Sequence, residues 1–195
     1  HRRRGLSNQP PGDQMKKILL GILAALFSSL AAAQPYPTKP IRIMVAFPPG
    51  GPTDIIARLV SPKMSEILGQ SVVVENVTGA GGNIATPRVA KADPDGYTIL
   101  LHSSGFAVNP ALSSNAGYDP QKDFVPVVIV ASQPNVIIVN AAFPARTLPE
   151  LLQLAKTQKL AYASPSSGTT PHLTGELFAR LTGTKLTHVP YRGTA

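Results

Sequence analysis

The order of strand-like and helix-like segments constrains the fold of this chain more than any other feature. Residues 41–47, 72–76 and 97–102 are short runs rich in β-branched and apolar residues, which predict strands. Apolar residues recur at helical spacing from residue 53 to 68, with Gly69 as a stop, and a short helix is expected after residue 84. Alternating strands and helices predict an α/β fold whose parallel sheet is covered by helices on its faces.

The second half of the chain repeats this alternation after two consecutive extended segments at residues 125–131 and 135–140. Thr147 and Glu150 have the spacing of a capping box, so a helix is expected to start there. A strand, a helix and the start of another strand are predicted at residues 160–163, 170–182 and 186–189. We therefore expect two α/β lobes, residues 34–135 and residues 136–195, the second being incomplete.

Composition excludes several classes of protein. Hydrophobic residues make up 43% of the chain and charged residues 14%, which is enough apolar material for a core and too little charge for a disordered chain. The absence of cysteine excludes disulfides, thiolate metal sites and a cysteine nucleophile. Half of the net charge of +8 lies in residues 1–33, and the basic residues of 34–195 are spread singly without a patch, so we expect no nucleic-acid partner.

The amino-terminal segment has the pattern of a secretory signal peptide. Met15 is followed by two lysines, an apolar run to residue 30 and three alanines that end at Ala33. The apolar run is too short for a membrane span, which takes about 20 residues. We expect residues 15–33 to be removed after about Ala33, and residues 1–14 to be a non-native or disordered extension.

Two turns share one construction, and each leads from a strand into a helix. The first turn covers residues 47–54 and the second covers residues 164–172; both contain Gly and Pro, and the second is rich in hydroxyl groups. The start of a helix carries unpaired N–H groups and a partial positive charge, so it attracts anions without a basic side chain. Facing turns of this kind suit a small carboxylate, although tight strand-to-helix turns alone would have the same sequence.

Two residues need separate interpretation. Asp54 would repel an anion, so it either stabilises the start of its helix or contacts an amino or hydroxyl group of the ligand. Ser103 follows the third strand and can face the same cleft. The chain has no Gly-x-Ser-x-Gly elbow and no histidine spacing typical of a metal site, so we expect no catalytic residue, metal or cofactor.

The motifs taken together resemble the Bug family, the TctC-like periplasmic receptors of tripartite tricarboxylate transporters. The resemblance rests on residues 40–54, 74–76, 79–84, 95–98, 162–178 and 188–195. It implies a type II-like, two-lobed periplasmic-binding-protein fold, a small carboxylate ligand, a membrane permease as partner, and a monomeric protein without enzymatic activity. The ligand-binding residues that it implies are Phe47, Gly50, Gly51, Asp54, Ser103, Ser167, Thr169, Thr170 and His172.

The chain departs from the family pattern at three points, and two other functions are compatible with its residues. Pro87 lies where the family continues a helix, the Pro-Gly usual before residue 160 is missing, and family members are longer. One alternative function is a ligand-dependent sensor that presents its closed form to a signalling protein. The other is a hydrolase that uses Ser103 or Ser167 with His172.

Overall fold

A computed structural model describes residues 35–193 of the chain. The following description concerns the compact unit of residues 39–195, of which residues 39–193 are described. The predicted extension at residues 1–14 and the predicted signal peptide at residues 15–33 lie outside the described residues. No helix within residues 35–193 combines the length and the apolar character that crossing a membrane requires.

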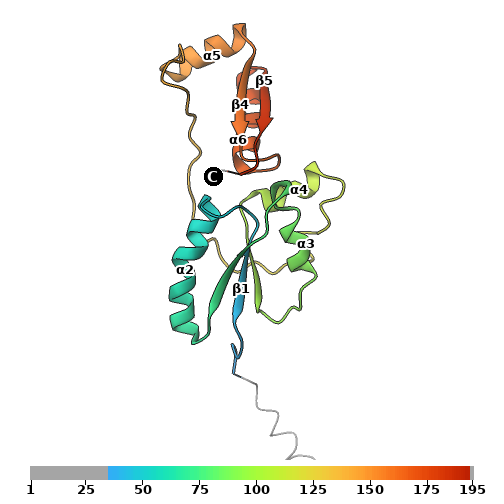
Figure 1. Ribbon diagram of the computed structural model, residues 1–195. Helices are drawn as coiled ribbons and strands as arrows, with labels where there is room; N and C mark the ends of the chain where they lie inside the picture. The colour runs from blue at the N-terminus through green and yellow to red at the C-terminus, as the bar shows by residue number, and fades with distance from the viewer. Residues whose placement is uncertain (1–34, 194–195) are drawn as a thin grey trace, which may run out of the picture. The chain divides into compact units, whose positions relative to one another are not determined.

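Strands and helices alternate along the chain, as the sequence predicts, except that two helices follow one another between residues 105 and 157 (Figure 1). A single 3-10 turn, η1, precedes α3. The elements are, in chain order, β1 (Ile41–Val45), α2 (Pro52–Leu68), β2 (Val72–Asn76), η1 (Ala80–Gly82), α3 (Ala85–Ala90), β3 (Thr98–Leu101), α4 (Gly105–Leu112), α5 (Leu148–Thr157), β4 (Leu160–Ser164), α6 (Thr170–Thr182) and β5 (Leu186–Pro190).

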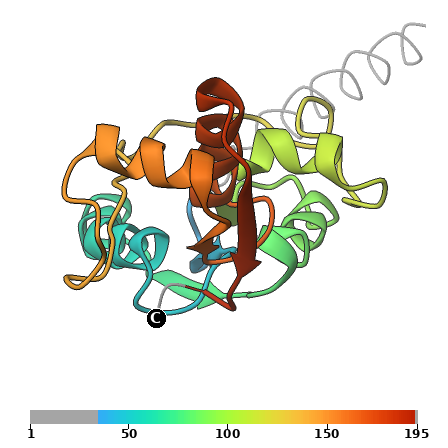
Figure 2. The same cartoon turned by 90° about the horizontal axis from the view of Figure 1, so that it is seen from above.

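The first sheet is parallel and has β1 at its centre, between β2 and β3. Successive side chains of a strand point to opposite faces, so β1 supplies both cores. Val45 packs with Ala57 of α2, whereas Met44 packs with Ala85 of α3. The view from above shows α2 and α3 on the two sides of these strands (Figure 2). The predicted parallel sheet with helices on both faces is confirmed.

Two helices contain residues that favour their interruption. Pro62 lies inside α2, where proline can bend or split a helix, yet α2 continues through it. Proline removes only the one hydrogen bond that its own N–H would donate, and the apolar face packed on the sheet keeps the helix together. The sequence analysis missed α4 because Gly105 and Pro110 are poor helix formers.

The second sheet consists of β4 and β5, which pair in parallel, with α6 between them in the chain. The predicted capping box at the start of α5 is confirmed. The Glu150 N–H donates to the Thr147 hydroxyl at 3.4 Å, and the Thr147 N–H donates to the Glu150 carboxylate at 3.1 Å. Local sequence signals therefore locate these elements correctly.

The segments at residues 125–131 and 135–140 belong to no helix or strand of the described chain. Their β-branched side chains face solvent: Val125 is 87% exposed, and Ile129 and Ile138 are each 86% exposed. A β-branched run forms a strand only where a partner supplies hydrogen bonds and burial. The predicted lobe boundary between residues 135 and 136 falls in this segment and stays a prediction.

Candidate functional site

The first strand-to-helix turn is held together by one hydrogen bond within the turn and one from the end of β2. Gly50 adopts a left-handed conformation, with φ of +79°, and Gly51 is the N-cap of α2. The Gly51 N–H donates to the Pro48 carbonyl at 3.3 Å. The Asn76 side chain, at the end of β2, donates to the Phe47 carbonyl at 3.0 Å. The predicted residues Phe47, Gly50 and Gly51 therefore belong to one rigid turn.

Asp54 points back into this turn. Its side chain is 3% exposed. It accepts hydrogen bonds from the Gly50 N–H at 2.9 Å, from Arg58 Nε at 2.9 Å and from Asn76 Nδ2 at 2.9 Å. The hydrogen bond from Arg58, with those from Gly50 and Asn76, lowers the pKa of Asp54 to about 2. This network supports the helix-start interpretation of Asp54, and contact with a ligand stays a prediction.

The second turn, between β4 and α6, has Thr169 as the N-cap of its helix. Gly168 precedes this cap and is left-handed, with φ of +77°. The Thr169 hydroxyl donates to the Ser166 carbonyl at 2.6 Å. The Gly168 N–H donates to His172 Nδ1 at 3.1 Å, so Nδ1 carries no proton and the neutral ring carries its proton on Nε2.

The two turns have the same geometry. In each turn, a left-handed glycine lies one residue before the N-cap. The N–H of this glycine donates to the side chain of the third helix residue, from Gly50 to Asp54 in the first turn and from Gly168 to His172 in the second. The first amides of an α-helix have no acceptor within the helix. Pro52 and Pro171 carry no N–H, so the groups that can donate to a negatively charged group are the amides of Thr53 and Asp54 in α2 and of Thr170 and His172 in α6.

Three stacked aromatic rings lie beside the second turn. The His172 ring stacks on His188 with centroids 4.0 Å apart, and His188 stacks on Tyr162 with centroids 5.0 Å apart. His188 Nε2 lies 2.7 Å from the Ser164 hydroxyl. Burial, together with His172, lowers the pKa of His188. Because Ser164 also donates to the Ser166 carbonyl at 3.1 Å, His188 is the donor to Ser164 and does not act as its base.

Three buried polar atoms lie where the chain leaves β2 and β3. Asn83 Oδ1, His102 Nε2 and Ser103 Oγ have no hydrogen-bond partner within residues 35–193. His102 Nδ1 lies 2.9 Å from the Ser103 carbonyl and must donate to it, so Nε2 is the unprotonated nitrogen. Burial lowers the pKa of His102, because it disfavours the charged ring. The Ser103 hydroxyl is thus available to a further partner.

Residues that follow β3 make contacts with both turns. The Phe47 ring packs edge-on against His102, with centroids 5.1 Å apart. The Ser104 hydroxyl lies 3.0 Å from the Thr170 hydroxyl. Ser104, which the sequence analysis missed, therefore reaches Thr170, whereas its neighbour Ser103 does not. A run of hydroxyl residues after a predicted strand was the only signal for it, and that signal did not single out one serine.

Ser167 has an exposed side chain, whereas Thr169 is 4% exposed. The Thr169 hydroxyl and the Thr169 N–H both donate to the Ser166 carbonyl inside the turn, at 2.6 Å and 3.4 Å. Among residues 35–193, no three histidine, aspartate or glutamate side chains gather closely enough to hold a metal ion.

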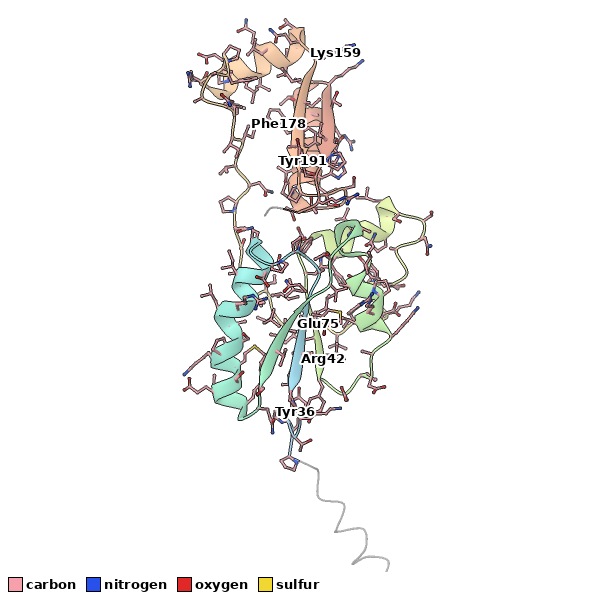
Figure 3. All side chains as sticks on the ribbon, in the orientation of Figure 1. Tyr36, Arg42, Glu75, Lys159, Phe178 and Tyr191 are labelled. Atoms are coloured by element: carbon pink, nitrogen blue, oxygen red, sulfur yellow. The ribbon has the colours of Figure 1, made fainter. Side chains whose placement is uncertain are left out.

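A surface depression lies at the opposite end of the first sheet, where β1 and β3 begin. Figure 3 labels Arg42, which contributes to its wall, and Glu75 on the neighbouring strand. Lys39 at this depression is paired with Asp95 at 2.9 Å. Ligands of open α/β sheets bind beyond the carboxyl ends of the strands, so we do not assign the ligand to this end.

Residues 56–195 match the sequence pattern of the TctC family, described as the tripartite tricarboxylate transporter family receptor. The chain belongs to the TctC family. A Pseudomonas protein, described as the UPF0065 protein in the tcbD-tcbE intergenic region, is 43% identical over 185 residues, 92% of this chain and 55% of its own length. Protein BugT of Bordetella pertussis is 38% identical, covering 90% of this chain and 56% of its own length. This TctC chain thus spans about half the length of these relatives.

Solved structures give the same assignment. A structure titled as a periplasmic transporter is 48% identical, with a TM-score of 0.75 over 81% of this chain and 54% of its own. A Rhodopseudomonas palustris protein solved with adipate is 40% identical, with a TM-score of 0.76 over 81% of this chain and 54% of its own. MatC of the same organism, solved with bound malate, is 34% identical, with a TM-score of 0.71 over 81% of this chain and 55% of its own. TctC proteins are periplasmic solute-binding proteins, and this chain has their α/β fold.

Proposed function

We propose that this protein is an exported receptor that captures a small carboxylate in the periplasm and delivers it to the membrane permease of a tripartite tricarboxylate transporter. Membership of the TctC family supports the transporter partner. The pattern of residues 15–33 supports export, with cleavage after about Ala33. The ligand class is supported by family members solved with adipate and with malate.

The observation that carries the proposal is the shared geometry of the two turns. Each left-handed glycine is fixed by the third residue of the following helix, Asp54 or His172, so the turn is ordered before a ligand arrives. Amides at a helix start and the partial positive charge there stabilise an anion. Hydrogen bonds to a charged group contribute about 1.5–3 kcal/mol each. Several of them would give binding in the micromolar range, about −8 kcal/mol.

Calorimetric titration of the full-length protein with adipate, malate and citrate tests the ligand class. We expect micromolar binding of at least one of these carboxylates and none of the matched amides, because the amides carry no negative charge. Chromatography of the ligand after incubation tests the alternative chemistry. Turnover that is lost in Ser167→Ala would contradict the receptor function and support a hydrolase.

A glycine substitution in the first turn separates backbone binding from side-chain charge. Gly51 has φ of −76° and ψ of 164°, which valine adopts without backbone strain, and thermal unfolding checks that the Gly51→Val protein is folded. The valine side chain would cover the approach to the first amides of α2, and we expect at least about tenfold weaker carboxylate binding. Titration of the two proteins with the same carboxylate measures this effect.

Arg42→Ala is the control, because it removes a positive charge from the other end of β1. The Arg42 guanidinium lies 3.3 Å from the Thr98 hydroxyl and 3.9 Å from the Glu75 carboxylate. Exposed pairs of this kind contribute little, so carboxylate affinity should stay within about twofold of the unmodified protein. Equal losses in Gly51→Val and Arg42→Ala would contradict binding through the backbone.

A further inference from the structure

We propose that Asn109 is a positioning residue, which holds the second turn against the first half of the protein in the arrangement that binds the ligand. The proposal rests on the proposed function. Asn109 lies on α4 and is 2% exposed. Its side-chain amide donates to the Gly81 carbonyl at 3.0 Å. Its Oδ1 lies directly against Gly168 of the second turn.

Three glycines allow this close approach, and we call Gly81, Gly105 and Gly168 the glycine seam. A Cβ on Gly81 would overlap the Ser167 carbonyl oxygen, and a Cβ on Gly168 would overlap Asn109 Oδ1. A Cβ on Gly105 would lie 2.5 Å from the Gly168 carbonyl oxygen, and Cβ atoms in proteins essentially never come within 3.0 Å of such an atom. Backbone therefore meets backbone at Gly81 and Gly105, and the Asn109 side chain meets backbone at Gly168, so none of the three positions has room for a side chain.

The seam joins segments that are distant in sequence. Gly81 belongs to the turn after β2 and Gly105 begins α4, whereas Gly168 lies in the turn between β4 and α6. Gly105 and Asn109 are four residues apart on α4, so they share one helix face. The hydrogen-bonded hydroxyls of Ser104 and Thr170 lie next to the seam. Gly168 and Thr170 flank Thr169, which is the N-cap of α6. The seam therefore fixes the position of the backbone N–H groups at the start of α6.

Gly105→Ala tests this role without adding backbone strain. Gly105 has no left-handed φ and lies inside a helix, where alanine is favoured over glycine. If the seam were irrelevant to binding, this substitution would leave affinity unchanged, even where the overlap with Gly168 lowers the thermal midpoint. We expect at least tenfold weaker binding of adipate or malate, because the added methyl group pushes the Gly168 carbonyl away. Ala107→Ser, at an exposed position of the same helix, is the matched control.

A double-mutant cycle tests Asn109 itself. Asn109→Ala removes the bond to Gly81 and is expected to weaken carboxylate binding at least tenfold, mainly through faster dissociation. It also frees the space that a Cβ on Gly168 would occupy. Gly168→Ala should therefore weaken binding less in the Asn109→Ala background than in the unmodified protein. Additive effects would contradict the proposed role of Asn109.

Hydrogen exchange distinguishes failure of this proposal from failure of the proposed function. In the unliganded Gly105→Ala protein, amides of residues 166–170 should exchange at least tenfold faster, while those of β1 stay protected and report an intact fold. If the unmodified protein binds no carboxylate but this exchange pattern is seen, the proposed function fails and the seam contact stands. Unchanged exchange at residues 166–170, or unchanged affinity in a protein that binds, would overturn the proposal.

Discussion

Gly82→Ala is expected to destabilise the protein by at least about 3 kcal/mol, as measured by denaturant unfolding. Gly82 has φ of +101°, a conformation that residues with a side chain rarely adopt. A Cβ at this position would also overlap His102 Nε2. The His102 ring cannot move away cheaply, because Phe47 packs against it and Nδ1 is bonded to the Ser103 carbonyl.

Two further variants separate the backbone strain from the overlap. Gly69→Ala also places alanine at a positive φ, +65°, but its Cβ would meet nothing within 4 Å. We expect it to cost only about 1 kcal/mol. His102→Ala makes room beside Gly82, so Gly82→Ala should cost less in that background than in the unmodified protein. A cost as small as that of Gly69→Ala would show that the contact with His102 is unimportant.

Asp54→Asn is expected to lower the free energy of unfolding at pH 7 by about 2–3 kcal/mol. Its carboxylate is buried and accepts hydrogen bonds from Gly50, Arg58 and Asn76. The asparagine side chain keeps one acceptor oxygen, but its NH2 group replaces the other carboxylate oxygen. There a donor would face a donor, and the hydrogen bond would be lost. Asp93→Asn, at an exposed carboxylate, is the matched control and should change stability by less than about 0.5 kcal/mol.

The pH dependence of this effect follows from the lowered pKa. The pKa of Asp54 is about 2 in the folded protein, compared with 3.8 for an unperturbed aspartate. The folded state therefore binds the proton less well than the unfolded state, and the stabilisation is complete above about pH 5. It should decline by about 2 kcal/mol between pH 5 and pH 2. The difference in stability between the unmodified protein and Asp54→Asn should shrink over this range, and a constant difference would contradict the assignment.

The unfolding experiments and the binding experiments report on different properties of the same turns. Asp54 and His172 fix the glycine that precedes each helix start, so their loss should affect both stability and affinity. Gly51→Val keeps both of these hydrogen bonds and is expected to affect affinity more than stability, whereas Gly105→Ala should affect both. Affinity and stability have to be measured separately for a receptor that binds through backbone amides, because a mutation cannot remove these amides and acts on binding only through the surrounding side chains.

Local patterns were sufficient to predict most of the secondary structure. The runs at residues 41–47 and 72–76 became β1 and β2, and the capping box at Thr147 starts α5. These signals depend on neighbours within a few residues, so the sequence shows them directly. Residues 125–140 contain β-branched runs of the same kind, but they form no strand within the described chain because pairing needs a partner segment.

The sequence by itself determined the alternation of strands and helices and the two turns rich in glycine, because helix starts and strand ends are recognisable from adjacent residues. Only the tertiary structure decided what the polar residues of those turns do. Asp54 meets Asn76 across 22 residues, Asn109 meets Gly81 across 28, and Ser104 meets Thr170 across 66. No local pattern encodes such pairs, because each depends on how separate elements pack and on where the missing side chain of a glycine leaves room.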